Sequence, residues 1–138
     1  MKKLILTAIL TVASFSTQAG EIAQLNLNRD LSAVIGNSKT TYGVNNFFFI
    51  TKKRIELIQI GLNVTCNDEI NRINSKRIAI KCIQEDDIKI IKRVKSQAGR
   101  NYIINELKKK GTLDWEGWKA RDQNFIDNFE AIGNNKVL

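Results

Sequence analysis

The sequence predicts an α+β fold, in which a small antiparallel sheet is followed by two C-terminal amphipathic helices and held by one disulfide. Near the middle of the chain, apolar residues recur at every second position, as in a strand with one buried face. Towards the C-terminus they recur at steps of three and four, as in an amphipathic helix. The chain also has two cysteines close together in the sequence, which favours a covalent link within a small domain.

Residues 1–19 have the layout of a secretory signal peptide. A lysine pair precedes an apolar run over residues 4–12, and small side chains suit cleavage after Ala19. The apolar run is shorter than the roughly 20 residues of a membrane-spanning helix, and no second apolar segment follows. We therefore expect a bacterial-type leader that is cleaved, a single exported domain over residues 20–138, no transmembrane segment in it, and a periplasmic or secreted location.

The first part of that domain is expected to contain a short helix and a strand. Residues 27–37 read LNRDLSAVIGN, which suits a short helix that ends at Gly36. Residues 45–50 read NNFFFI, a compact apolar run typical of a strand. The basic KKR stretch then separates this strand from the next apolar segment.

Two further strands are expected to share a buried interior, and each carries a cysteine. Residues 55–66 place one alternating set on a single face: Ile58, Ile60, Leu62, Val64 and Cys66. Residues 77–83 do the same with Ile78, Ile80 and Cys82. The polar connection, residues 67–75, suits a helical turn capped by Asn67 or Asp68.

The cysteine pair predicts a structural Cys66–Cys82 disulfide. An exported protein meets an oxidising compartment, and two cysteines allow one pairing within the chain. Two buried thiols, a cysteine nucleophile or a metal site are the alternatives, but the chain has no histidine to serve as base or companion ligand. A short turn near residue 71 would not set the two cysteines directly opposite each other, so the register between the strands stays open.

The C-terminal third predicts two helices. Residues 84–110 open with acids and close with Lys108, Lys109 and Lys110 before Gly111, which suits the helix dipole and a glycine cap. Its start, IKII, also fits a continuation of the sheet. A second helix is expected from an aromatic and apolar stripe with one acid in it, formed by Trp115, Trp118, Asp122, Phe125, Phe129 and Ile132.

Missing residue types exclude several chemistries. Without histidine there is no Ser-His-Asp triad, no HExxH metalloprotease site and no histidine-based ribonuclease site. No GxSxG, GxxxxGK[ST], GxGxxG or SxxK sequence is present. Carboxylate pairs remain at residues 68–69, 85–87 and 114–116, and their positions near predicted helix starts and loops also fit capping. We expect no cofactor and no metal.

The charge distribution suggests an anionic partner. The chain carries 22 basic and 14 acidic residues, and loss of the leader lowers its net charge from +8 to +6. Residues 52–110 hold 15 of the basic and 7 of the acidic side chains. The aromatic residues lie apart from this basic zone, and export also argues against nucleic acid as the partner. A solvated basic face without a partner is the simpler alternative.

Together these observations predict a small, basic, exported protein that binds and does not catalyse, of the inhibitor or immunity type, with an acidic envelope or periplasmic protein as its partner. Candidate contact residues are the cations Lys92, Arg93, Lys108, Lys109 and Lys110. The alternative is a small carboxylate-dependent hydrolase of cell-wall glycan, which needs two carboxyl groups about 5–10 Å apart across a groove. An exposed apolar patch with a basic rim would favour the binding protein.

Overall fold

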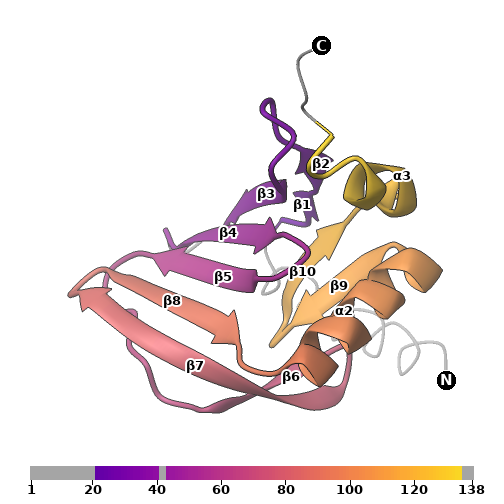
Figure 1. The fold of residues 1–138 in the computed structure, drawn as a ribbon. Helices are drawn as coiled ribbons and strands as arrows, with labels where there is room; N and C mark the ends of the chain where they lie inside the picture. Colours follow the sequence, from indigo (N-terminus) through magenta and orange to yellow (C-terminus); the bar gives the residue numbers. More distant parts are fainter. Residues whose placement is uncertain (1–20, 41–42, 135–138) are drawn as a thin grey trace, which may run out of the picture.

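The structure is a computed structural model that describes residues 21–40 and 43–134. The predicted signal peptide, residues 1–19, lies outside this range. The described residues form a ten-stranded mixed sheet that curls into a nearly closed barrel, with two helices together on one side of it (Figure 1). The predicted fold, a small antiparallel sheet followed by two long helices, is therefore wrong, because most of the expected helical sequence is sheet.

The strands and helices follow the chain in a simple order. They are β1 (Ala23–Gln24), β2 (Asn26–Leu27), β3 (Val34–Lys39), β4 (Asn45–Ile50), β5 (Ile55–Ile60), β6 (Ile70–Ile73), β7 (Lys76–Asp86), β8 (Lys89–Val94), α2 (Gln97–Lys110), β9 (Thr112–Trp115), β10 (Trp118–Arg121) and α3 (Phe125–Glu130). Among the described residues, neither helix is long and apolar enough to cross a membrane.

One short segment closes the sheet. The strand order is β1-β10-β9-β6-β7-β8-β5-β4-β3-β2, so β1 and β2 stand at opposite ends although only Leu25 separates them in sequence. β1 pairs in parallel with β10, β2 pairs antiparallel with β3, and the Leu25 N–H donates to the Arg121 carbonyl at 2.8 Å. Gly36 in β3 permits the close approach, since a Cβ there would lie 2.7 Å from the Leu25 side chain and 2.8 Å from the Gln24 carbonyl oxygen.

The interior is filled from every part of the barrel. Phe48 of β4, Leu57 of β5 and Trp115 of β9 are almost fully buried, and α2 adds Ile103 and other apolar side chains to the same cluster. Burial of such a cluster is the main force that stabilises the fold.

The buried Trp115 ring also needs a polar partner, because its indole N–H is removed from water. That N–H donates to Asn71 Oδ1 at 2.8 Å, which joins β9 to β6 inside the barrel.

The N-terminal half differs from its prediction at two points. Residues 27–37 form a turn and β3 instead of a helix, because the Asn28 side chain accepts hydrogen bonds from the Ser32 and Ala33 N–H groups and the β-branched pair Val34–Ile35 then joins the sheet. β5 ends at Ile60, and its inner residues are Ile55 and Leu57. The predicted inner face, with Ile58 and Ile60, is therefore wrong, since both faces of IELIQI are apolar enough to be buried.

The segment from residue 84 to residue 111 divides into strand and helix. Residues 89–94 are β8, so the alternative in which IKII continues the sheet is correct, and the acids at 85–87 lie at the β7–β8 turn. α2 starts only after Ser96, whose hydroxyl accepts a hydrogen bond from the Gly99 N–H at 3.0 Å. The predicted cap at Gly111 is confirmed, with φ of 70°.

The predicted second long helix is also wrong. Residues 112–121 form the β9–β10 hairpin, whose turn has positive φ at Glu116 (52°) and Gly117 (92°), a geometry that no helix accommodates. Only residues 125–130 are helical. Asp122, the acid in the predicted stripe, is buried and accepts a hydrogen bond from the Asn124 N–H at 2.9 Å where α3 begins.

The predicted Cys66–Cys82 disulfide is confirmed, with a Cα–Cα distance of 5.7 Å. The expected helical turn at residues 67–75 is wrong, because the segment forms β6 and a hairpin whose turn is at Asn74 and Ser75, both at positive φ. That turn is central between the two cysteines and brings them together. Gln84 then holds the preceding loop against β7, since its side chain accepts from the Cys66 N–H and donates to the Val64 carbonyl, both at 3.1 Å.

Replacement of both cysteines by serine should destabilise the protein by about 3 kcal/mol, because the bridge closes a loop of about 15 residues in the unfolded chain. Urea unfolding of the double variant and of the wild type would measure the difference in the free energy of unfolding. Wild-type protein kept reduced is the matched control and should unfold like the variant. A difference below about 0.5 kcal/mol would mean that the bridge adds little beyond the hydrogen bonds of Gln84.

Candidate functional site

The outer side of the barrel carries a row of apolar side chains that runs across four strands. Phe47 on β4 lies opposite Ile58 on β5, Ile58 lies opposite Ile91 on β8, and Ile91 lies opposite Ile83 on β7. Residues paired in this way point to the same side of a sheet. Since the inner side at these strands is occupied by Phe48, Leu57 and their neighbours, this row faces outwards.

Neighbouring rows widen this apolar surface. Ile35 on β3 lies opposite Phe49 on one side of the row, and Ile60 lies on the other side. Ile35 is 39% and Phe47 37% exposed, whereas the other members are half-buried. We call these seven residues the outer apolar face: Ile35, Phe47, Phe49, Ile58, Ile60, Ile83 and Ile91. A contiguous patch of this kind marks an interaction site more often than scattered apolar residues do.

Part of the face is concave. A hollow of about 650 Å³ lies over β3, β4 and β5, with Ile35, Phe47 and Ile58 among the side chains that line it and Lys89 at its edge. A hollow of this size is large enough to receive apolar side chains of a partner.

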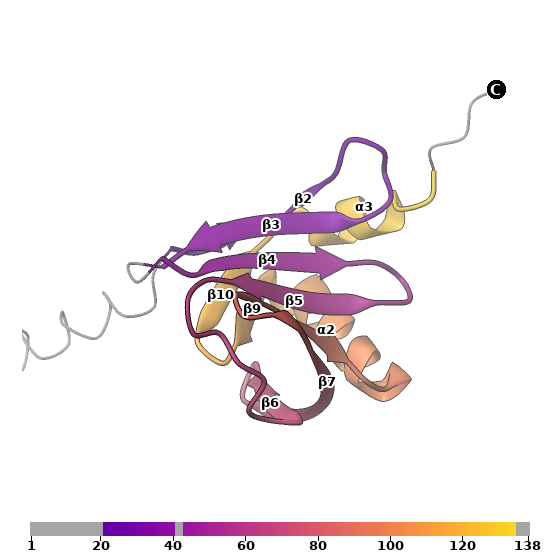
Figure 2. The same cartoon turned by 90° about the vertical axis from the view of Figure 1, so that its left-hand side faces the viewer.

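The helices lie elsewhere in the described part of the chain. α2 packs on β9, and α3 packs on α2 and β2. Figure 2 shows β3, β4 and β5 in front with both helices behind them. The outer apolar face is therefore directed away from the helical side of the molecule.

Cations surround the outer apolar face. The Arg54 guanidinium lies over the Phe49 ring, 5.3 Å from its centroid, and Arg93 extends from β8 beside Ile91. By the strand register, Lys39 and Lys89 lie on the row of Ile60, at the opposite side. We call Lys39, Arg54, Lys89 and Arg93 the basic rim.

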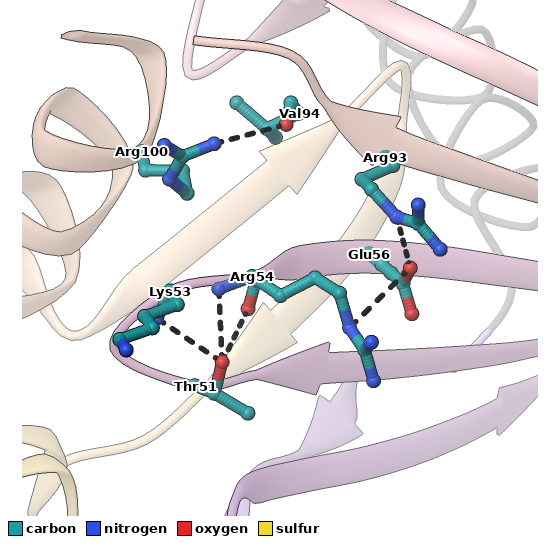
Figure 3. A network of polar contacts seen from close by, with 7 residues as sticks. All are labelled: Thr51, Lys53, Arg54, Glu56, Arg93, Val94 and Arg100. Atoms are coloured by element: carbon teal, nitrogen blue, oxygen red, sulfur yellow. Dashed lines mark hydrogen bonds and ion pairs between the residues drawn. The ribbon is translucent and has the colours of Figure 1, made fainter. Parts of the chain in front are cut away.

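A buried carboxylate positions the two arginines of the basic rim (Figure 3). Glu56 is only 5% exposed, and its Oε2 lies 2.5 Å from Arg93 Nε and 3.6 Å from Arg54 Nε. The turn before β5 is held by Thr51, whose hydroxyl accepts the Lys53 and Arg54 N–H groups at 3.2 and 2.9 Å. Two guanidinium groups share one carboxylate here, so this side of the rim keeps a net positive charge.

Lys92 and Arg93, predicted as neighbours in one binding site, point to opposite sides of β8. Arg93 belongs to the basic rim, whereas Lys92 lies opposite Leu57 and Cys82 on the inner side. Burial lowers the pKa of Lys92, and the carboxylates of Glu116 and Asp68 oppose this in part. The structure therefore separates this pair.

Lys108, Lys109 and Lys110 form the last turn of α2, whose 14 residues span about 21 Å beyond the end of β8. The Lys108 Nζ lies 5.4 Å from the centroid of the Phe129 ring, and the Lys110 Nζ lies 3.0 Å from Glu106 Oε1. The hydrogen bonds from Lys110 and then from Asn74 hold the pKa of Glu106 below its ordinary value. The three lysines thus complement the helix end, and a role for them in binding stays a prediction.

Most of the carboxylates considered for catalysis serve turns. Asp86 accepts a hydrogen bond from the Ile88 N–H, Asp114 accepts one from the Gly117 N–H, and Glu116 accepts one from the Arg72 N–H. Glu116 also lines a polar groove of about 1180 Å³ beside the disulfide, together with Asp68, Glu69 and four basic side chains. Among the described residues, no group of three cysteines or acids is arranged to hold a metal ion.

Comparison with known proteins gives no family for this chain: no family model, no curated protein and no solved structure matches it. The geometry and chemistry of the described residues are therefore the basis on which its function can be inferred.

The sequence analysis missed the outer apolar face, although the signal was present. In FFF and IELIQI, apolar residues occupy consecutive positions, which predicts strands that are apolar on both sides. Only the inner side of such a strand can reach the core of a single-layer barrel, so the second side remains for a partner.

The Glu56→Gln variant should lose about 1–2 kcal/mol of stability, because it leaves two guanidinium groups of the basic rim without their shared charged partner. Glu85→Gln is the matched control: Glu85 pairs with Lys89 at 3.6 Å on the exposed surface, and its loss should cost under about 0.5 kcal/mol. Urea unfolding at pH 7 would measure both changes. Equal effects of the two substitutions would show that the Glu56 network contributes no more than a surface ion pair.

Proposed function

We propose that this chain is a non-catalytic binding protein of the inhibitor or immunity type, exported to the periplasm or the medium, which covers an acidic surface of an envelope protein. The observation that carries this proposal is the outer apolar face with its basic rim. Apolar area at the centre with polar or charged groups around it is the usual anatomy of a protein–protein interface.

Charge complementarity selects an acidic partner. The basic rim adds four cations around the apolar residues, and the chain as a whole carries an excess of basic side chains. Charges at a rim accelerate encounter with an oppositely charged partner and discourage wrong ones more than they add affinity. The apolar centre would then supply most of the binding free energy.

The disulfide supports the exported location. Such bonds persist in oxidising compartments and are rare in the cytosol, and the Cys66–Cys82 bridge joins two parts of the described chain with ordinary backbone geometry. Together with the leader expected from residues 1–19, it favours the periplasm or the medium as the place of action.

Phe47→Ser should weaken binding to the natural partner by about 30-fold, since it removes an aromatic anchor worth about 2 kcal/mol from the middle of the face. The partner would be captured from a bacterial envelope extract on the immobilised mature protein, purified, and titrated against each variant by calorimetry. Ile126→Ser is the matched control, because Ile126 is 47% exposed on α3, on the helical side.

Unchanged affinity of the Phe47→Ser variant, with affinity lost in the Ile126→Ser variant, would contradict the proposal. Hydrolysis of a cell-wall glycan suspension by the wild-type protein, abolished by substitution of Asp68 or Glu69, would instead support the hydrolase and the polar groove as its site. Thermal melting of each variant would establish that it is folded.

A further inference from the structure

We infer that the part of the partner that covers the outer apolar face is an amphipathic α-helix with acidic residues on both sides of its apolar stripe. The inference rests on the proposed function and adds to it the conformation and the charge pattern of the bound segment. It follows from strand pairing, from the spacing of the apolar row and from the position of the basic rim.

Strand pairing excludes the addition of a partner strand at the centre of the face. β4 is paired with β3 and β5, β5 with β4 and β8, and β8 with β5 and β7. Their backbone N–H and C=O groups are therefore already used within the barrel. Recognition by β-augmentation needs a strand edge with unpaired groups, so a partner at Phe47, Ile58 and Ile91 must be bound through side chains.

The spacing of the apolar row suits a helix. Phe47, Ile58, Ile91 and Ile83 lie on adjacent strands, and adjacent strands are about 4.8 Å apart, so the row extends over about 14 Å. A helix presents one apolar position per turn of about 5.4 Å, and residues i to i+11 span about 16 Å. An extended segment repeats on one side only every 6.6–6.8 Å, roughly two strand spacings for every three residues needed here, and fits the row less well.

The basic rim defines the sides of that helix. Arg54 and Arg93 flank the row on the side of Phe49, and Lys39 and Lys89 flank it on the side of Ile60. A helix along the row would bring the positions next to its apolar stripe towards these cations. Aspartate or glutamate at those positions would be attracted, and lysine or arginine would be repelled.

The same rim argues against a second copy of this chain as the occupant. Two outer apolar faces brought together would place two sets of like charges around one interface, which costs free energy. A helix with acidic flanks avoids this cost and covers the hollow beside Lys89 with its apolar side chains.

A selection from random 16-residue peptides displayed on phage would test the inference. The mature wild-type protein serves as bait, and binders that also bind the Phe47→Ser variant are removed. Selected sequences should carry apolar residues at steps of three and four, with aspartate or glutamate on both flanks. A synthetic peptide of that sequence should gain helical circular dichroism on binding, and a proline at its centre should weaken binding at least tenfold.

The possible results separate the inference from the proposed function. Selected peptides with apolar residues at every second position, or binding that tolerates the central proline, would overturn the helix and leave a binding face. Selected helices with basic flanks would overturn the charge pattern. Absence of any peptide that depends on Phe47, or a concentration-dependent dimer of the protein that Phe47→Ser abolishes, would overturn both. Ile126→Ser, used as bait in parallel, should select the same sequences as the wild type.

Discussion

The closure of the sheet by residues 23–27 is the constraint on which the rest of the structure depends. β1 and β2 contain two residues each, yet together they bond β10 at one end of the sheet and β3 at the other. A sheet with two exposed edges would offer unpaired backbone groups to other chains. Closure removes most of that edge and fixes which side of every strand faces the core.

That choice of sides creates the outer apolar face. β4 and β5 are apolar on both sides, so whichever side faces the interior, the other must meet water or a partner. Phe48 and Leu57 fill the barrel, and Phe47 and Ile58 are left outside. Strands that are apolar on both sides usually occur in sheets covered on both sides by other elements. Here the helices α2 and α3 lie on another side, and the described chain itself does not cover this face.

The sequence predicted some parts of this structure better than others, for physical reasons. The disulfide and the glycine cap at Gly111 depend on residue chemistry that is visible in the sequence, and both are confirmed. The strand at NNFFFI is also confirmed, because six apolar and β-favouring residues in a row leave few alternatives. Residues 112–121 were misread as helix, because the stripe of apolar residues can satisfy steps of three and four by chance while Gly117 enforces a hairpin turn.

The binding face was harder to foresee than the fold. The basic residues were visible, but the register that brings Arg54 and Arg93 to one carboxylate joins β5 and β8, far apart in sequence. Lys92 and Arg93 are adjacent in sequence yet face opposite sides, which any strand would impose once IKII is known to be a strand. Periodicity suggests which elements form, whereas the pairing of distant strands decides which side chains meet.

The most direct test of this account is native-state hydrogen exchange of the Leu25 amide, which donates to the Arg121 carbonyl at the point of closure. If the barrel depends on this segment, the Leu25 amide should exchange only through global unfolding, with the same free energy and the same denaturant dependence as the amides of β4 and β5. Exchange of Leu25 with a far lower free energy, while the amides of β4 and β5 remain protected, would contradict the account, because the sheet would then keep its shape with the closing segment detached.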